Sequence, residues 1–204
     1  MVILKRLFIA GLFLLSVQAV YAQNDVIKAF QQSYLLEKSG KNKEALDALK
    51  KVYQEDNYEI NLRLGWLSYL SGMFTESIAY YNNAIHKMPV SVEARLGIVL
   101  PLSAMGNWNQ VIEQYNKILR VDPQNTVVNY RLGVIYYERK QYGKAETYLK
   151  KVVNLFPFDH DSLLMLAWTK YRQGDYNQAK VLFNKALMAD PYDTSAKKGL
   201  SLLK

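Results

Sequence analysis

The chain of 204 residues contains no cysteine and only two histidines. Without thiols it forms no disulfide, thiolate zinc site, iron–sulfur cluster or cysteine nucleophile. Histidine-rich metal sites and ordinary histidine-dependent catalysis are also disfavoured, because His86 and His160 are the only imidazoles. The chain also lacks a phosphate-binding loop, a His-Glu-x-x-His motif and a nucleophile elbow. These absences predict a binding protein that is not an enzyme and that uses no cofactor and no metal.

His160 is the one position where a metal site competes with a simpler interpretation. It lies between Asp159 and Asp161, and imidazole and carboxylate groups together can hold a metal ion. The start of a helix also explains the two acidic residues, because carboxylates are stabilised near the positive end of the helix dipole. We favour the helix start. His86 falls in the last turn of another expected helix, where a cation is mildly favoured.

The chain has one long apolar run, from Leu7 to Val20, and Lys5 and Arg6 precede it. A basic start, about fourteen apolar residues and small residues after them are typical of a signal peptide. We expect residues 1–22 to be this signal and cleavage to follow Ala22. An uncleaved anchor in the inner membrane is the alternative, although a membrane span needs about twenty apolar residues. The expected location is the bacterial periplasm, or secretion.

Proline is rare, yet four of the five prolines follow one period of 34 residues. Polar residues suited to capping a helix N-terminus keep the same step, and so do aromatic residues. The prolines are Pro89, Pro123, Pro157 and Pro191; the caps Asn57, Ser91, Asn125, Asp159 and Asp193; the aromatics Phe74, Trp108, Tyr142 and Tyr176. Several series with one period predict stacked supersecondary units in place of one closed globule.

Each unit is predicted to contain two helices. An apolar stretch with helical periodicity follows the cap, and a turn is expected near Gly72, Gly106, Lys140 or Gly174, because glycine adopts a left-handed conformation at little cost. A second helix then carries Lys and Glu outside and Ala, Leu and Tyr inside before it ends at the proline. Its acidic residues, such as Glu44 and Glu146, are expected to lie on a solvated face. No segment alternates like a β-strand.

This pattern resembles the tetratricopeptide repeat family. Leu64-Gly65, Leu132-Gly133 and Leu166-Ala167 occupy the family's small-residue pair, and Ala45, Ala145 and Ala179 its small position in the second helix. The resemblance implies an all-α, right-handed α-solenoid of helix-turn-helix repeats across residues 23–193. We place the repeats at 26–57, with Asp25 as its cap, 58–91, 92–125, 126–159 and 160–193. Residues 194–204 are expected to form a C-terminal capping helix.

The third repeat departs from the family pattern. Val99, Val111 and Ile118 occur where small residues are usual, and Pro101 lies inside the expected first helix. Proline clashes with the carbonyl four residues earlier and removes a hydrogen bond, so we expect a kink there.

The resemblance implies that the first helices line a concave groove. Aromatic and apolar residues fill most of the corresponding positions here, and exposed surface of this kind marks partner sites. The expected ligand is an apolar or aromatic peptide or helix; the alternative is that these side chains pack on one another. The groove candidates are Phe30, Tyr34, Leu62, Arg63, Trp66, Tyr69, Leu96, Tyr130, Arg131, Val134, Tyr137, Leu164, Trp168 and Tyr171.

Arg63 and Arg131 are the nearest candidates for pairing with a ligand carboxylate. A solvated helix flank, or an ion pair with Glu59 or Asp161, is the alternative role that we favour for them.

These features together predict a non-catalytic protein–protein interaction scaffold or adaptor in the cell envelope, with another protein of an envelope complex as its partner. The net charge of +8 leaves one alternative, in which lysines on the convex second helices bind anionic polysaccharide or a membrane surface. Export argues against nucleic acid as the partner, and membrane contact is otherwise expected only through an uncleaved signal peptide.

Overall fold

The computed structural model describes residues 23–203, so the predicted signal peptide lies outside the described residues. Every regular element between residues 23 and 203 is helical, and none of these helices combines the length and apolarity that a membrane crossing requires. The chain divides into two compact units, residues 1–111 and 112–204.

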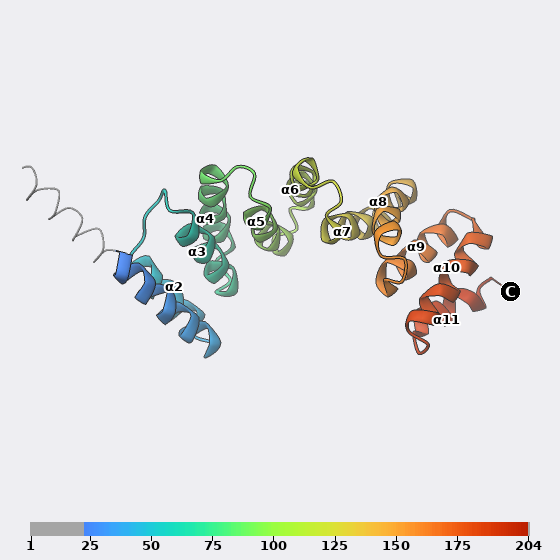
Figure 1. Ribbon diagram of the computed structural model, residues 1–204, viewed down its shortest axis with the longest axis horizontal. Helices are drawn as coiled ribbons and strands as arrows, with labels where there is room; N and C mark the ends of the chain where they lie inside the picture. Colours follow the sequence, from blue (N-terminus) through green and yellow to red (C-terminus); the bar gives the residue numbers. More distant parts are fainter. Residues whose placement is uncertain (1–22, 204) are drawn as a thin grey trace, which may run out of the picture. The chain divides into compact units, whose positions relative to one another are not determined.

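The first unit contains five consecutive helices and the start of a sixth (Figure 1). The helices cover residues 23–38, α2 (Asn42–Lys50), α3 (Tyr58–Leu70), α4 (Phe74–Lys87), α5 (Val92–Ala104) and the first turn of α6 (Trp108–Val121). From α2 to α5 each helix packs on the next, and α3 also packs on α5.

The second unit repeats the same arrangement. After the remainder of α6, α8 packs on α7 and α9, and α10 packs on α9 and α11. Alternate helices also touch, since α9 contacts both α7 and α11. The helices are α7 (Thr126–Glu138), α8 (Tyr142–Leu155), α9 (His160–Arg172), α10 (Tyr176–Ala189) and α11 (Thr194–Ser201). This packing of helix pairs confirms the prediction of an all-α solenoid fold.

The predicted capping residues begin five of these helices. The side-chain oxygen of each accepts a hydrogen bond from the backbone N–H three residues later, as in Asn57 to Ile60 at 2.9 Å and Asp159 to Ser162 at 2.9 Å. Ser91, Asn125 and Asp193 do the same for α5, α7 and α11. The cap predicted at Asp25 is wrong, because the first helix already includes Gln23; Asp25 lies 3.7 Å from Lys28 instead.

The predicted turns have the left-handed backbone that their sequence suggests. Gly72, Gly106 and Gly174 have φ between +73° and +80°, and Lys140 reaches +59°. A side chain at such a position costs roughly 1 kcal/mol, so the Lys140 turn is the strained member of the set.

Helix α5 runs through Pro101 from Val92 to Ala104, and Pro101 is buried. The Pro101 carbonyl still accepts a hydrogen bond from the Met105 N–H at 3.0 Å. The helix therefore continues past the proline, and the kink itself stays a prediction.

Glycines in the first helices of the pairs let a large side chain approach closely. A Cβ built on Gly65 would lie 2.9 Å from the ring of Tyr81, and one on Gly133 would lie 2.6 Å from Cγ of Leu149. Tyr81 and Leu149 belong to the second helices of the same pairs and are almost fully buried. The small residue thus sets how closely the two helices of a pair approach.

We expect Gly133→Ala to lower the free energy of unfolding by about 1–2 kcal/mol, because the added methyl group overlaps Leu149 in a filled core. Gly143→Ala is the matched control, since nothing lies within 4 Å of its Cβ position. It should raise stability by about 0.5 kcal/mol through helix propensity. Urea unfolding followed by circular dichroism measures both; equal effects would contradict the packing role of Gly133.

Glu146 does not lie on a solvated face, which corrects the interpretation from sequence. Its carboxylate accepts from Lys150 (2.6 Å), Lys170 (2.7 Å) and Gln173 (2.8 Å). Burial alone would raise the pKa of Glu146, but these donors outweigh it and lower the pKa to about 2. Lys170 is itself only 6% exposed, so this carboxylate joins α8 to α9.

We expect Glu146→Gln to lower the free energy of unfolding at neutral pH by about 1–2 kcal/mol. The depressed pKa of Glu146 means that its contribution is present above the unfolded value near 4.5 and is lost as the pH falls toward 2. The difference between wild type and variant should therefore shrink over this range. Glu44→Gln, which removes the exposed 3.6 Å pair with Lys41, should cost less than about 0.5 kcal/mol. A difference independent of pH would contradict this account of Glu146.

Candidate binding cleft

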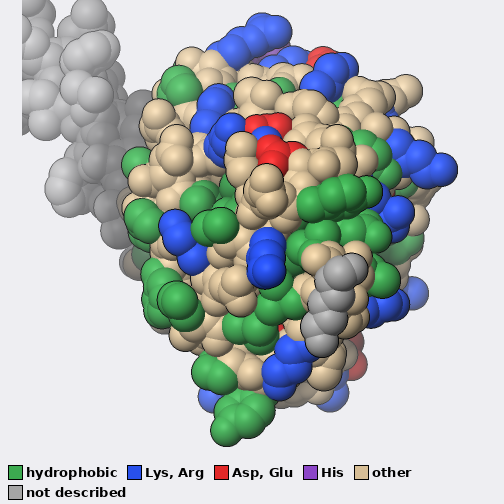
Figure 2. Space-filling model, turned by 90° about the vertical axis from the view of Figure 1, so that its right-hand side faces the viewer, with side chains coloured by type: hydrophobic (Ala, Val, Ile, Leu, Met, Phe, Trp, Pro, Cys, Tyr) green, Lys and Arg blue, Asp and Glu red, His purple; other side chains and the backbone are tan. Residues whose placement is uncertain are grey.

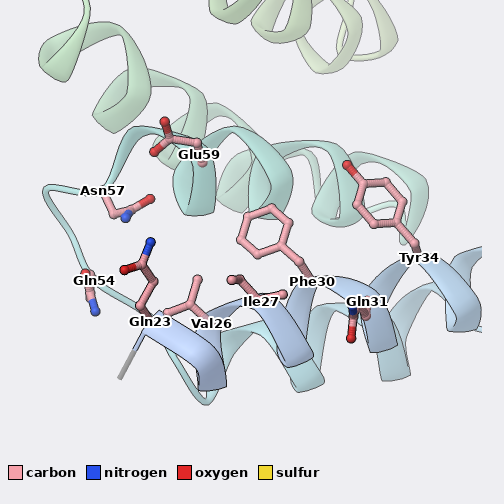
Figure 3. A pocket seen from close by; sticks show the side chains of 9 residues that line it. All are labelled: Gln23, Val26, Ile27, Phe30, Gln31, Tyr34, Gln54, Asn57 and Glu59. Carbon is pink, nitrogen blue, oxygen red and sulfur yellow. The ribbon is translucent and has the colours of Figure 1, made fainter. Parts of the chain in front are cut away.

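The first unit has a cleft of about 740 Å³ beside its first helix (Figure 3). One wall is a stripe of that helix made by Val26, Ile27, Phe30, Gln31 and Tyr34, with Gln23 at its end. Gln54, Asn57 and Glu59 form the other wall, from the loop before α3 and the first turn of α3. Figure 3 shows Phe30 and Tyr34 rising from the first helix on the side of α3.

The first helix has two faces that explain the cleft. Ala29 and Ser33 are buried, and Ala29 belongs to a core cluster with residues of α2 and α3. This contact turns the neighbouring stripe outward, so that Ile27 is 48% and Tyr34 56% exposed. The cleft therefore has apolar side chains facing water, at helical spacing.

The opposite wall is held by Asn61, a fully buried residue of α3. Its side-chain amide donates to the carbonyl oxygens of Glu55 (2.7 Å) and Asn57 (2.7 Å), and Gln54 at 3.3 Å. Because these bonds fix the loop before α3, Gln54 and Asn57 keep their places beside the first helix.

Arg63 lies next to the lining residue Tyr34 and is only 7% exposed. Its guanidinium pairs with Glu37 at 2.5 Å and donates to Ser33 at 3.1 Å, and the Tyr34 ring covers it at 3.8 Å. The roles that we favoured for Arg63, a solvated flank or an ion pair with Glu59, are therefore wrong, and its pairing with a ligand carboxylate stays a prediction. Its charge is used inside the fold, whereas Arg131 is exposed on α7.

Comparison with protein-family models matches residues 30–92 and 124–190 to two models, each described as a tetratricopeptide repeat. Together the matches cover well over half of the chain. The chain belongs to the tetratricopeptide repeat family. The crystal structure of a tetratricopeptide repeat protein from Parabacteroides merdae has the same fold, with a TM-score of 0.76 at 19% identity over 88% of this chain and 72% of that one.

Other proteins also match this chain, and some of them are much longer. The MamA protein matches with a TM-score of 0.72 at 18% identity, over 83% of this chain and 93% of that chain. The mouse BBSome complex member BBS4 is 25% identical over 134 residues, and human protein O-mannosyl-transferase TMTC1 is 27% identical over 135. These alignments cover 66% of this chain but only 26% and 15% of the two relatives.

The predicted groove residues do not all lie at the cleft. Phe30 and Tyr34 line the cleft, whereas Leu62 and Leu96 are half-buried elsewhere in the first unit. Six further candidates lie half-buried in the second unit: Tyr130, Val134, Tyr137, Leu164, Trp168 and Tyr171. Within the first unit, Phe30 and Tyr34 of the predicted set lie together at the cleft.

Both tryptophans of the predicted groove are held by their own unit. The Trp66 indole N–H donates to Glu37 at 2.7 Å, and that of Trp168 donates to Ser195 at 2.9 Å. Trp168 also lies edge-on to Phe183, with ring centroids 5.0 Å apart. Tyr69 and Tyr171 pack beside these tryptophans. These four aromatic side chains therefore pack on one another and on their own unit, as the alternative interpretation of the groove expected.

Sequence reasoning missed Val26, Ile27 and Gln54 as lining residues. The available signal was the first repeat itself, which is 32 residues long and has Glu55 where the later repeats have proline. That irregular loop and the apolar stripe of the first helix line the cleft.

We expect Trp66→Ala to lower the free energy of unfolding by about 2–3 kcal/mol, because the indole packs on the core and its N–H bonds to Glu37. Tyr34→Ala should cost less than about 1 kcal/mol, since most of that side chain is exposed and only its contact with Arg63 is lost. Thermal and urea unfolding measure both. A Tyr34 variant as unstable as the Trp66 variant would contradict the assignment of Tyr34 to the surface.

Proposed function

We propose that this protein is a non-catalytic interaction scaffold whose N-terminal cleft binds an apolar, helical segment of a partner protein. The observation that carries the proposal is the cleft of about 740 Å³, in which Ile27 and Tyr34 are half exposed although each could bury apolar surface. Such surface is stabilised when a partner removes it from water.

The spacing of the stripe fits a helix as the occupant. Val26, Phe30 and Tyr34 follow one another at intervals of four, so they form a straight apolar ridge along the first helix. A partner helix can lay an apolar face along such a ridge. The rim offers amide groups from Gln23, Gln31, Gln54 and Asn57 for polar contacts.

The charge of the cleft indicates which charge the partner segment carries. Among the described residues that line the cleft, Glu59 is the one with a charge, and the nearby Arg63 is already paired with Glu37. A partner segment that carries a Lys or Arg beside its apolar face therefore complements this site better than an acidic tail does.

One of the two longer relatives supports the class of function. BBS4 is described as a BBSome complex member, which fits a repeat that works within an assembly. TMTC1 is described as a transferase, but the aligned part is only 15% of it. The basic start and apolar run of residues 1–22 are typical of a signal peptide. We therefore place the scaffold in the periplasm or outside the cell, where it serves an envelope complex.

The lysine-rich alternative has less support. Several lysines of the second helices are paired with carboxylates, including Lys50 with Glu76 and Lys117 with Glu113. On the face seen in Figure 2, Lys and Arg side chains are scattered between hydrophobic and uncharged groups and do not form one continuous field. A dispersed charge attracts a polyanion weakly.

The test is a display library of amphipathic helical peptides selected on the full chain, with affinities measured by fluorescence anisotropy. We expect selected peptides to bind the Ile27→Ser, Tyr34→Ser double variant at least about tenfold more weakly, because most of the apolar contact is lost. Binding should persist at high salt, whereas attraction to a lysine face would be screened.

Tyr176→Ser is the matched control, because Tyr176 is also 56% exposed but lies in the second unit. It should bind within about twofold of wild type. Thermal melts show whether each variant is folded. Peptides that bind the double variant equally, or that are released by salt, would contradict the cleft. Self-association lost in the double variant would identify a second copy as the occupant.

A further inference from the structure

Three side chains that are distant in sequence converge at the end of the second unit. His160 begins α9, while Asp190 and Asp193 lie in the turn that joins α10 to α11. One ligand atom from each lies within 4.8 Å of the others. The side chains of His160 and Asp193 are only 25% and 15% exposed.

The ring of His160 is oriented by a further carboxylate. Its Nδ1 lies 3.0 Å from Oδ1 of Asp161, a hydrogen bond in which a neutral imidazole donates from Nδ1. The Nε2 lone pair then faces inward, where that atom is buried and has no hydrogen-bond partner. It lies 3.4 Å from Oδ2 of Asp193. In this tautomer two acceptors face each other, and a cation between them, either a proton on Nε2 or a metal ion, stabilises the pair.

Backbone groups orient both aspartates. Oδ1 of Asp193 accepts from the Ala196 N–H as the cap of α11, which leaves Oδ2 toward His160. Oδ1 of Asp190 accepts from the Tyr192 N–H at 2.9 Å, which leaves its second oxygen for a ligand. Two ligand atoms, each about 2.1 Å from a tetrahedral metal, lie about 3.4 Å apart. The distance between Nε2 and Asp193 matches this geometry.

The corresponding place in the first unit shows that the fold itself does not need this cluster. Tyr58 and Ser91 precede His160 and Asp193 by three periods of the repeat. There the Tyr58 hydroxyl simply meets the Ser91 hydroxyl at 2.7 Å, and Met88 stands where Asp190 does. A neutral hydrogen bond therefore suffices to join a first helix to the next cap.

We propose that His160, Asp190 and Asp193 bind a divalent transition-metal ion of the Zn²⁺ class, with Asp161 holding the imidazole. Nitrogen and carboxylate oxygen are ligands that Zn²⁺ accepts, and three protein ligands leave one position for water. A carboxylate on the distal imidazole nitrogen is the usual second partner of such a ligand. The ion would join α9 to the α10–α11 turn and so stabilise the position of α11.

The sequence interpretation considered Asp159 and Asp161 as partners of His160 and preferred a helix start without a metal. Asp159 does cap α9, through Ser162. The two aspartates that meet Nε2 are 30 and 33 residues later, and only the packing of α11 against α9 brings them to it.

The test uses the full chain without a polyhistidine tag, stripped with EDTA and titrated with ZnCl₂ near neutral pH. Imidazole ¹⁵N spectra contain signals from only two histidines. We expect one equivalent of Zn²⁺ to shift Nε2 of His160 and to leave exposed His86 unchanged. Calorimetry should give one site, and Mg²⁺ should not compete, because it prefers all-oxygen ligands.

Four variants decide between this site and the alternatives. His160→Gln and Asp190→Asn should weaken Zn²⁺ binding at least about tenfold; the Asn side chain keeps the bond to the Tyr192 N–H. His86→Gln removes the other imidazole, and Asp159→Asn keeps a good cap but lies outside the cluster. Both should bind Zn²⁺ as wild type does. Binding that survives His160→Gln, or an unshifted His160, would overturn the proposal and leave a protonated His160 paired with Asp193.

Discussion

The structure depends on how closely two neighbouring helices can approach each other. Where the first helix carries Gly65 or Gly133, the partner helix places Tyr81 or Leu149 directly against its backbone, at a distance that leaves no space for a Cβ. Ala45, Ala145 and Ala179 are fully buried on the partner helices. A helix pair without these small residues would separate, and the caps and turns that join one pair to the next would lose their register.

Carboxylates that bond to buried side chains of the neighbouring helix complete this packing. Glu37 receives both the Arg63 guanidinium and the Trp66 indole N–H, and thereby joins the first helix to α3. Glu146 does the same for α8 and α9 through Lys170. A buried charge is tolerated only when partners satisfy it, so these groups fix the orientation of helices whose apolar contacts alone would permit sliding. Arg63, which could have served a ligand, is used in this way.

The candidate cleft exists because the first repeat is irregular. Later pairs of helices are followed by a proline two residues before the next cap, whereas Glu55 occupies that position before α3. Asn61 holds this loop from inside. The first helix also has no earlier described helix to cover its outer stripe of Ile27 and Tyr34. At the other end α11 performs this covering, since its Ala196 and Gly199 are buried against the last pair. The proposed binding surface and the proposed metal cluster thus belong to opposite ends of the described chain.

The sequence by itself determined the helical repeat, its period, and the positions of its helix caps and turns. Caps such as Asn57 and Asp193, and turns such as Gly72 and Lys140, act through backbone groups within a few residues, so their types and spacing predict them directly. Only the tertiary structure decided which side chains are open to a partner. Trp66 and Trp168 satisfy the aromatic pattern of a groove, yet each finds a hydrogen-bond partner 27 or more residues away, and His160 meets Asp193 across a similar gap. Such partners are chosen by the packing of one helix pair on the next, which a local pattern does not contain.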